Sequence, residues 1–199
     1  NNHDPQLAER VIMLDAEIDR LQAEIEDQVI TMIALRAPLA EELRHIMAAL
    51  KITGDLERIG DLAKNIAKRS RAIATEQTPK PLIVGLRNMV ERALSQLKDV
   101  LDAYADRNPE LALSVWKRDE QIDAMYNSVF RELLTYMMED PRNIGMCTHL
   151  LFGAKNLERI GDHTTNIAET IHFFVLGRDI EDDRPKQDNT SKTLIDPTT

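Results

Sequence analysis

Large apolar side chains recur every three or four residues along most of the chain, which is the spacing of one face of an α-helix. Prolines and polar stretches interrupt this pattern and so mark the ends of the predicted helices. We expect helices over about residues 6–36, 39–74, 82–107, 110–139 and 142–176. Pro38 and Pro141 are expected to open the helices that follow them, because proline is tolerated in a first helical turn. The pattern therefore predicts an all-α protein.

An internal repeat organises the chain. The sequence Leu-Glu-Arg-Ile-Gly-Asp occurs at residues 56–61 and again at 157–162, and Asn-Ile-Ala follows both copies at the same distance. A second echo lies upstream, where the spacing of valine, aspartate and isoleucine in residues 11–19 returns in residues 115–123. Because the two echoes come in the same order, we interpret the chain as two copies of one helical unit.

The predicted architecture is two tandem three-helix bundles, with the N-terminal helix of the first bundle absent from this chain. Residues 1–77 form the first repeat with two of its three helices, and residues 82–177 form the complete second repeat. Residues 78–81 are the predicted linker, and the polar residues 178–199 a disordered tail. Without a third helix, the apolar stripe of the first repeat is expected to take cover from the second repeat or from a second chain.

Composition excludes several classes of function. The net charge of −9 disfavours a nucleic-acid partner, since binding phosphate groups requires a basic surface. The single cysteine excludes an internal disulfide and a cysteine-based zinc site. No catalytic triad, phosphate-binding glycine loop or cysteine–histidine pair is present, so we expect no enzyme. A cytoplasmic location is the default expectation, because no apolar run is long enough to span a bilayer.

Candidate chemistry lies in acidic pairs spaced four residues apart, which place two carboxylates on one face of a helix. The pairs are Asp15 with Asp19, Glu57 with Asp61, Asp119 with Asp123, and Glu158 with Asp162. Like charges at this spacing destabilise a helix slightly, so some compensating interaction is expected.

Folding each helix pair about its proline brings the acidic pairs to the same height. Asp15 is then level with Asp61, Asp19 with Glu57, Asp119 with Asp162, and Asp123 with Glu158. Four neighbouring carboxylates repel one another, and hard cations that prefer oxygen ligands relieve this repulsion. The acids lie opposite the apolar stripes, so we expect two metal clusters on the outside of the bundles. The alternative interpretation is a solvated acidic face without metal.

Further oxygen ligands are available near these clusters. The helix over residues 82–107 adds Asp99, Asp102 and Asp106, which project away from its apolar stripe. Asn65 and Asn166 each extend a motif helix by one more step of four residues and offer an amide oxygen. We include all five residues among the candidate metal ligands.

These residues resemble the PhoU family. The duplicated Leu-Glu-Arg-Ile-Gly-Asp with a following Asn-Ile is similar to the metal-binding motif of that family, and the similarity extends over about residues 5–177. The resemblance implies two three-helix bundles whose acidic clusters bind iron, zinc, manganese or magnesium ions.

The same resemblance implies a regulatory role. Members of the family link the ATPase of the phosphate ABC transporter to a sensor histidine kinase, and they repress the phosphate-starvation response when phosphate is plentiful. We therefore expect those two protein partners, a homodimer, and contact with the membrane only through protein partners. The alternatives are a carboxylate-bridged metalloenzyme and a metal-free helical scaffold.

Overall fold

A computed structural model describes residues 5–76, 78–182 and 184, and all regular structure in these residues is helical. The helices are α1 (Pro5–Arg36), α2 (Ala40–Ala72), α3 (Lys80–Ala105), α4 (Pro109–Lys117), α5 (Asp119–Glu139) and α6 (Ile144–Leu176), with a short 3-10 turn η1 (Pro141–Asn143) before α6. The all-α prediction is confirmed. None of the described helices combines the length and apolar composition that crossing a bilayer requires.

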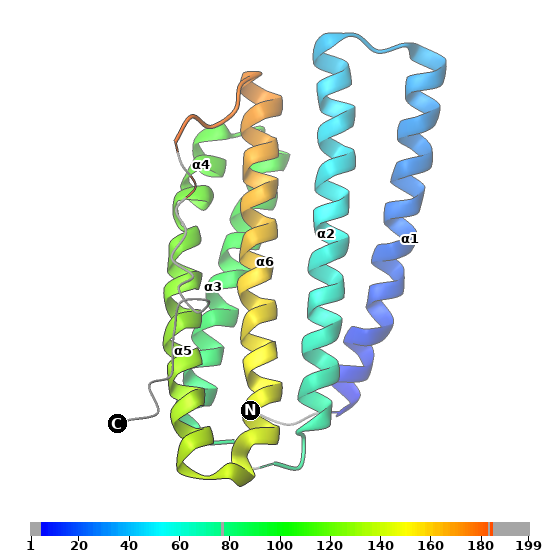
Figure 1. The fold of residues 1–199 in the computed structure, drawn as a ribbon. Coiled ribbons are helices and arrows are strands. Elements are labelled where there is room, and N and C mark those ends of the chain that lie inside the picture. The colour runs from blue at the N-terminus through cyan, green and yellow to red at the C-terminus, as the bar shows by residue number, and fades with distance from the viewer. Residues whose placement is uncertain (1–4, 77, 183, 185–199) are drawn as a thin grey trace.

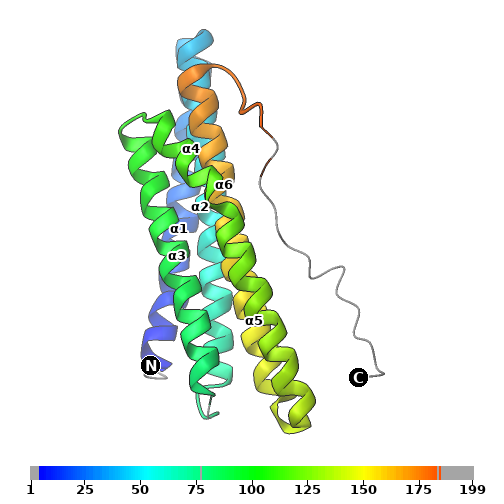
Figure 2. The same ribbon diagram turned by 90° about the vertical axis from the view of Figure 1, so that its left-hand side faces the viewer.

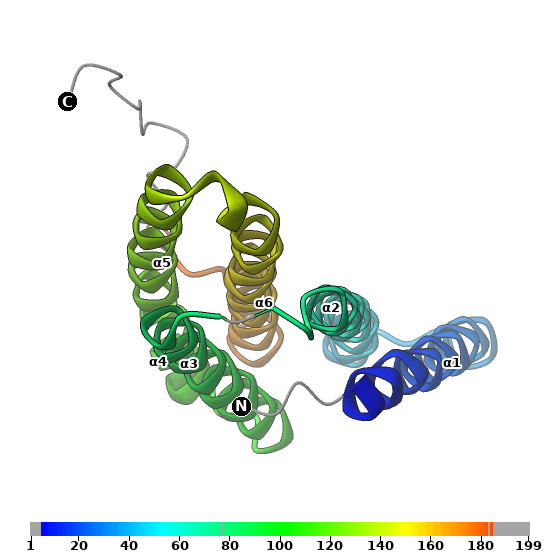
Figure 3. The same cartoon turned by 90° about the horizontal axis from the view of Figure 1, so that it is seen from below.

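The helices form two groups that meet along α2 and α6. Helices α1 and α2 make an antiparallel hairpin, while α3, α4, α5 and α6 form the second group (Figure 1). Seen from below, α2 lies between α1 and α6, and α3 and α5 flank α6 on its other sides (Figure 3). Helix α6 contacts α2, α3, α4 and α5 and is therefore the central element of the molecule.

One apolar core joins the two repeats. Helices α3, α5 and α6 contribute fully buried side chains such as Met89, Leu133 and Ile167, and α2 adds Ile52 and Leu62 to the same cluster. Burial of each such side chain stabilises the fold by roughly 1.5–3 kcal/mol. The second repeat therefore buries the apolar face of α2, which is one of the two arrangements expected from the sequence.

Helix α1 does not share in that core. Among the described helices its substantial contacts are with α2 alone. Leu7, Leu14 and Leu21 remain 56%, 54% and 44% exposed, although their spacing of seven residues places them on one side of the helix. An apolar stripe therefore runs along α1 beside its contact with α2.

The helix predicted over residues 110–139 is divided in the structure. It ends at Lys117 and restarts at Asp119, so that α4 and α5 follow one another along one side of the bundle (Figure 2). The carbonyl group of Arg118, at the break, accepts a hydrogen bond of 3.0 Å from the buried Gln96 amide of α3. Periodicity could not reveal this break, because the apolar positions continue across it.

The ends of the helices follow local backbone chemistry. Pro141 opens η1 as predicted, whereas Pro38 lies in the loop before α2. At the end of α6, Gly177 adopts a φ of 71°, a left-handed conformation that favours glycine and reverses the chain. Most of the predicted disordered tail lies outside the described residues. Its described part, residues 178–182 and 184, runs back along the bundle (Figure 1).

Candidate metal-binding acidic clusters

The duplicated glycine allows the paired helices to approach closely beside the acids. A Cβ atom added to Gly161 would lie 3.0 Å from the Ile122 side chain on α5, and one added to Gly60 would lie 3.0 Å from Ile18 on α1. Both distances are tighter than ordinary van der Waals contact, so a larger residue would push the helices apart. The repeated motif therefore sets the separation between its own acids and those of the neighbouring helix.

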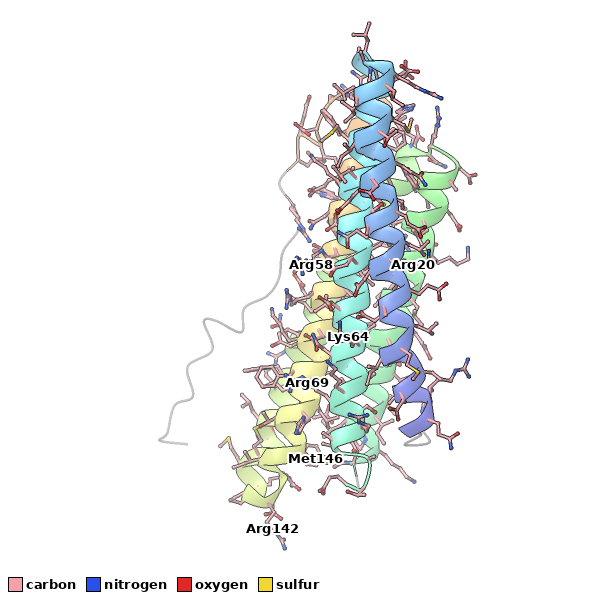
Figure 4. The ribbon with its side chains drawn as sticks, turned by 90° about the vertical axis from the view of Figure 1, so that its right-hand side faces the viewer. Arg20, Arg58, Lys64, Arg69, Arg142 and Met146 are labelled. Carbon is pink, nitrogen blue, oxygen red and sulfur yellow. The ribbon has the colours of Figure 1, made fainter. Side chains whose placement is uncertain are left out.

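In the first repeat a lysine joins the acids of α1 and α2. The Lys64 ammonium forms ion pairs with Asp15 and with Asp61, which confirms that these two acids lie at one level. Hydrogen bonding to Lys64 lowers the pKa of the Asp61 carboxyl, and the same contacts, with Asp15 first, raise the pKa of Lys64. Arg58 and Lys64 lie along the same helix (Figure 4), and Arg58 adds a contact of 3.4 Å to Glu57.

In the second repeat an arginine from beyond α6 takes the equivalent place. Arg184 Nε lies 2.9 Å from an oxygen of Asp119, and its Nη2 lies 2.7 Å from an oxygen of Asp162. The other Asp119 oxygen accepts a hydrogen bond of 2.9 Å from the Thr165 hydroxyl. The predicted level of Asp119 with Asp162 is thus confirmed by their common partner.

Glu158 of the second repeat has one carboxylate oxygen that is paired and one that is not. One of its oxygens accepts a hydrogen bond of 2.9 Å from Lys155, while Oε2 is buried without a hydrogen-bond partner. Burial raises the pKa of the Glu158 carboxyl, Lys155 opposes this rise, and the nearby Asp162 and Asp123 reinforce it. A buried carboxylate oxygen without a partner is costly, and a bound cation would satisfy it.

The prediction that the clusters lie outside the bundles is wrong for four of the eight paired acids. Asp119, Asp123 and Glu158 are only 2%, 5% and 6% exposed, and Asp15 of the first repeat is also buried. Of the four candidate aspartates on α1 and α5, only Asp19 is exposed. The reason is the close approach at the duplicated glycines, which encloses side chains that a helical wheel places opposite the main apolar stripe.

The acids of α3 have partners of their own. Asp99 forms an ion pair of 2.6 Å with Arg118, Asp102 pairs with Lys98 of the same helix, and Asp106 is exposed at the end of α3. The described partners of Asp99 and Asp102 therefore lie on α3 and at the junction of α4 with α5.

The two candidate asparagines differ. Asn65 is exposed, whereas the amide oxygen of Asn166 accepts a hydrogen bond of 3.2 Å from Arg184. Asn166 thus belongs to the group of acids around Arg184. No described contact places Asn65 in the corresponding group of the first repeat.

The residues fit a metal ion in their chemistry but are not gathered around one position. Among the described residues, no three acidic, histidine or cysteine side chains are arranged so that they could hold a metal ion. Protein cations already contact the acids: Lys64 bridges two acids in the first repeat, Arg184 bridges two in the second, and Lys155 pairs with Glu158. The unpartnered oxygen of Glu158 and the all-oxygen donor set nevertheless suit a hard cation.

One contact between the repeats was not predicted from the sequence. The His163 ring lies 2.8 Å from a carboxylate oxygen of Asp55, which joins α6 to α2 beside an open cleft of 630 Å³. The repeats themselves carried a signal, because the counterpart of His163 is Leu62 and the counterpart of Asp55 is Asn156. Differences between the copies occur where the two motif helices face each other.

Taken together, the fold and the site define a tandem-repeat helical-bundle protein whose paired helices enclose duplicated acidic clusters. A family model described as the PhoU domain matches residues 1–70 and 86–171, which is one segment in each repeat. The chain belongs to the PhoU family.

Close relatives carry names from phosphate transport. The chain is 56% identical over 190 residues to the phosphate-specific transport system accessory protein PhoU homolog of Rhizobium meliloti, a match that covers 96% of this chain and 80% of the relative. It is 52% identical over 189 residues to the protein of the same name in Caulobacter vibrioides, where 95% of this chain and 82% of the relative are covered.

Solved structures share the fold. PhoU from Pseudomonas aeruginosa superimposes with a TM-score of 0.85 at 37% identity, covering 88% of this chain and 84% of the other. The phosphate transport system regulatory protein PhoU from Streptococcus pneumoniae gives a TM-score of 0.82 at 30% identity, covering 90% and 84%.

Proposed function

We propose that this chain is a regulator of phosphate uptake that couples the ATPase of the phosphate ABC transporter to a sensor histidine kinase. In this role it represses the phosphate-starvation response when phosphate is plentiful. The observation that carries the proposal is the match of both repeats to the PhoU family, whose relatives are named as accessory and regulatory proteins of phosphate transport. The proposed role is non-enzymatic and cytoplasmic, with protein partners as its only link to the membrane.

Metal binding is the second part of the proposal. Asp119, Asp123, Glu158 and Asp162 would hold a divalent or trivalent cation in the second repeat, and we favour iron or zinc over manganese or magnesium as the resident metal. Three of these acids are buried and one carries an unpartnered oxygen, so a cation would remove a real energetic cost. When bound, the metal supplies positive charge that draws α5 and α6 together, which would stiffen the surface offered to a protein partner.

The regulatory proposal is tested in cells that lack their native PhoU protein. The chain is expressed there at high phosphate, and a reporter of phosphate-starvation genes is measured together with the protein level. We expect the reporter to be silenced. Continued reporter expression in the presence of stable, folded protein would count against the proposal.

The metal proposal is tested by elemental analysis of gently purified protein. Glu158→Gln combined with Asp162→Asn should remove the metal of the second repeat and leave the helical circular-dichroism spectrum unchanged, because both substitutions preserve side-chain volume. Glu110→Gln combined with Glu139→Gln removes two exposed acids elsewhere and serves as the matched control. If both double variants retain the same amount of metal, the assignment of these ligands is wrong. If no metal is found in any sample, the unchanged chain included, the result favours a metal-free scaffold.

A further inference from the structure

The two acidic clusters differ in where their cation comes from. Lys64 follows Asp61 by three residues on the same helix, so the first repeat carries its cation within its own motif. Thr165 stands at the equivalent place after Asp162, and a threonine cannot supply charge. The second repeat instead receives Arg184, which lies on the segment that follows α6.

The path of that segment explains how Arg184 reaches the cluster. Gly177 reverses the chain in its left-handed conformation, and its N–H donates a hydrogen bond of 2.8 Å to the carbonyl of Phe173. The ring of His172 then lies 3.1 Å from the carbonyl oxygen of Arg178, and Ile180 packs against the apolar core. The chain is thereby directed back along the bundle (Figure 1).

The guanidinium of Arg184 is placed as a cation among ligands. It contacts side-chain oxygens of Asp119 at 2.9 Å, of Asp162 at 2.7 Å and of Asn166 at 3.2 Å, and the main-chain oxygen of Asp162 at 3.3 Å. All three residues are among the metal ligands expected from the sequence. A guanidinium and a metal ion compete for these oxygens, so binding of one weakens binding of the other.

The segment that carries Arg184 packs less closely on the bundle than the helix that carries Lys64. Residues 178, 179, 181 and 182 are exposed, and Ile180 is the only apolar side chain among described residues 178–182 and 184. Arg184 also leaves Glu158 Oε2 without a partner. A metal ion that replaced Arg184 and drew these acids together would gain that oxygen as a further ligand, which would favour exchange of the arginine for the ion.

We propose that Arg184 is a tethered competitor of metal at the acidic cluster of the second repeat. It neutralises the cluster when metal is scarce, and metal binding displaces it together with residues 178–182. The inference rests on the proposed metal binding of this repeat. The first repeat has no such release, because Lys64 is fixed on a helix.

The test is a calorimetric titration of the full chain with Mn²⁺ alone as the probe. Arg184→Gln should bind Mn²⁺ roughly tenfold more tightly than the unchanged chain, a ratio equal to about 1.4 kcal/mol. Arg178→Gln removes the same charge from an exposed position of the same segment, and its affinity should stay within about twofold. The control thereby separates release of the site from a general change in net charge.

Limited proteolysis supplies a second readout on the unchanged chain. Cleavage after Glu181 by a glutamate-specific protease should become faster once Mn²⁺ is added, because a protease needs a segment that has detached from the bundle. Equal Mn²⁺ affinity of the unchanged chain and Arg184→Gln, or an unaltered rate of this cleavage on metal addition, overturns the inference and leaves metal binding intact. If no variant gives binding heat with Mn²⁺, the titration is repeated with Zn²⁺, and the absence of binding heat with both ions overturns both proposals.

Discussion

At the residue scale, the glycine of the duplicated motif has a steric role. Gly161 faces Ile122, whose side chain is almost completely buried and therefore cannot move aside easily. Gly153 lies on the same helix, but an added Cβ would meet nothing within 4 Å. Comparing Gly161 with Gly153 therefore distinguishes a packing requirement for glycine from the general cost of glycine in a helix.

Gly161→Val is expected to lower the free energy of unfolding by roughly 1–3 kcal/mol, because the new methyl groups overpack the contact with Ile122. Gly153→Val should be close to neutral, since it meets open space and valine is a better helix former than glycine. Urea unfolding followed by circular dichroism measures both. Equal destabilisation would show that the close approach of α5 and α6 has no energetic weight.

Glu158 makes stability depend on pH in a specific direction. Its folded-state pKa is raised above the ordinary 4.5, so its protonated form stabilises the fold fully below that value. This stabilisation is lost as the pH rises through the raised pKa. Glu158→Gln imitates the neutral form, so we expect its stability relative to the unchanged chain to improve from pH 4 to pH 7.

The measurement uses urea unfolding at both pH values with a chelator present, so that metal does not contribute. Glu139→Gln, an exposed acid at the end of α5, is the matched control, and its stability difference should vary little with pH. If the stability of Glu158→Gln relative to the unchanged chain falls between pH 4 and pH 7, burial does not raise the pKa of this carboxyl.

At the element scale, the break between α4 and α5 is stabilised by Arg118. Its guanidinium Nε donates a hydrogen bond of 3.1 Å to the carbonyl of Ser114 in the last turn of α4, and its Nη2 pairs with Asp99 of α3. Carbonyl groups at the end of a helix lack partners within the helix, so this side chain replaces one of them. The break is therefore maintained by contacts on both sides.

Arg118→Met should lower the free energy of unfolding by about 1–2 kcal/mol, through loss of the hydrogen bond to Ser114 and the half-buried ion pair. Lys117→Met alters an exposed residue in the same turn and should change it by less than about 0.5 kcal/mol. Thermal or urea unfolding distinguishes the two variants. An Arg118→Met protein as stable as Lys117→Met would contradict the role of Arg118 at the break.

At the scale of the whole molecule, the two repeats are covered unequally. The α3 helix packs on α5 and α6 in the second repeat, while the leucine stripe of α1 stays about half exposed. Leu7, Leu14 and Leu21 recur every seven residues, a spacing typical of helices that pair along a seam. The homodimer that the family resemblance implies would place a second copy of the chain against this stripe.

Sedimentation velocity should therefore show a concentration-dependent dimer. Leu14→Glu combined with Leu21→Glu is expected to shift the protein to monomer at equal concentration, because the seam would place four like charges together. Ala16→Glu combined with Ala23→Glu adds the same charge to the opposite side of α1 and should leave the dimer intact. If the unchanged chain sediments as a monomer at all concentrations, this prediction is wrong.

The sequence by itself determined the helices, the duplication and the heights of the acids. Helix periodicity is a local property, and a turn at a known place sets which residues of two antiparallel helices lie side by side. The pairing of Asp15 with Asp61 and of Asp119 with Asp162 was predictable for that reason. The break at Arg118 was not predictable, since it depends on α3.

The tertiary structure alone decided which acids are buried and which cation accompanies each cluster. Burial of Asp119 and Glu158 follows from the close approach of α5 and α6, which a single helix cannot reveal. Arg184 lies 65 positions along the chain from Asp119, and no local pattern connects residues so far apart. Likewise, the packing of α2 on α6 arises because an apolar face requires cover, and only the folded chain shows which face provides it.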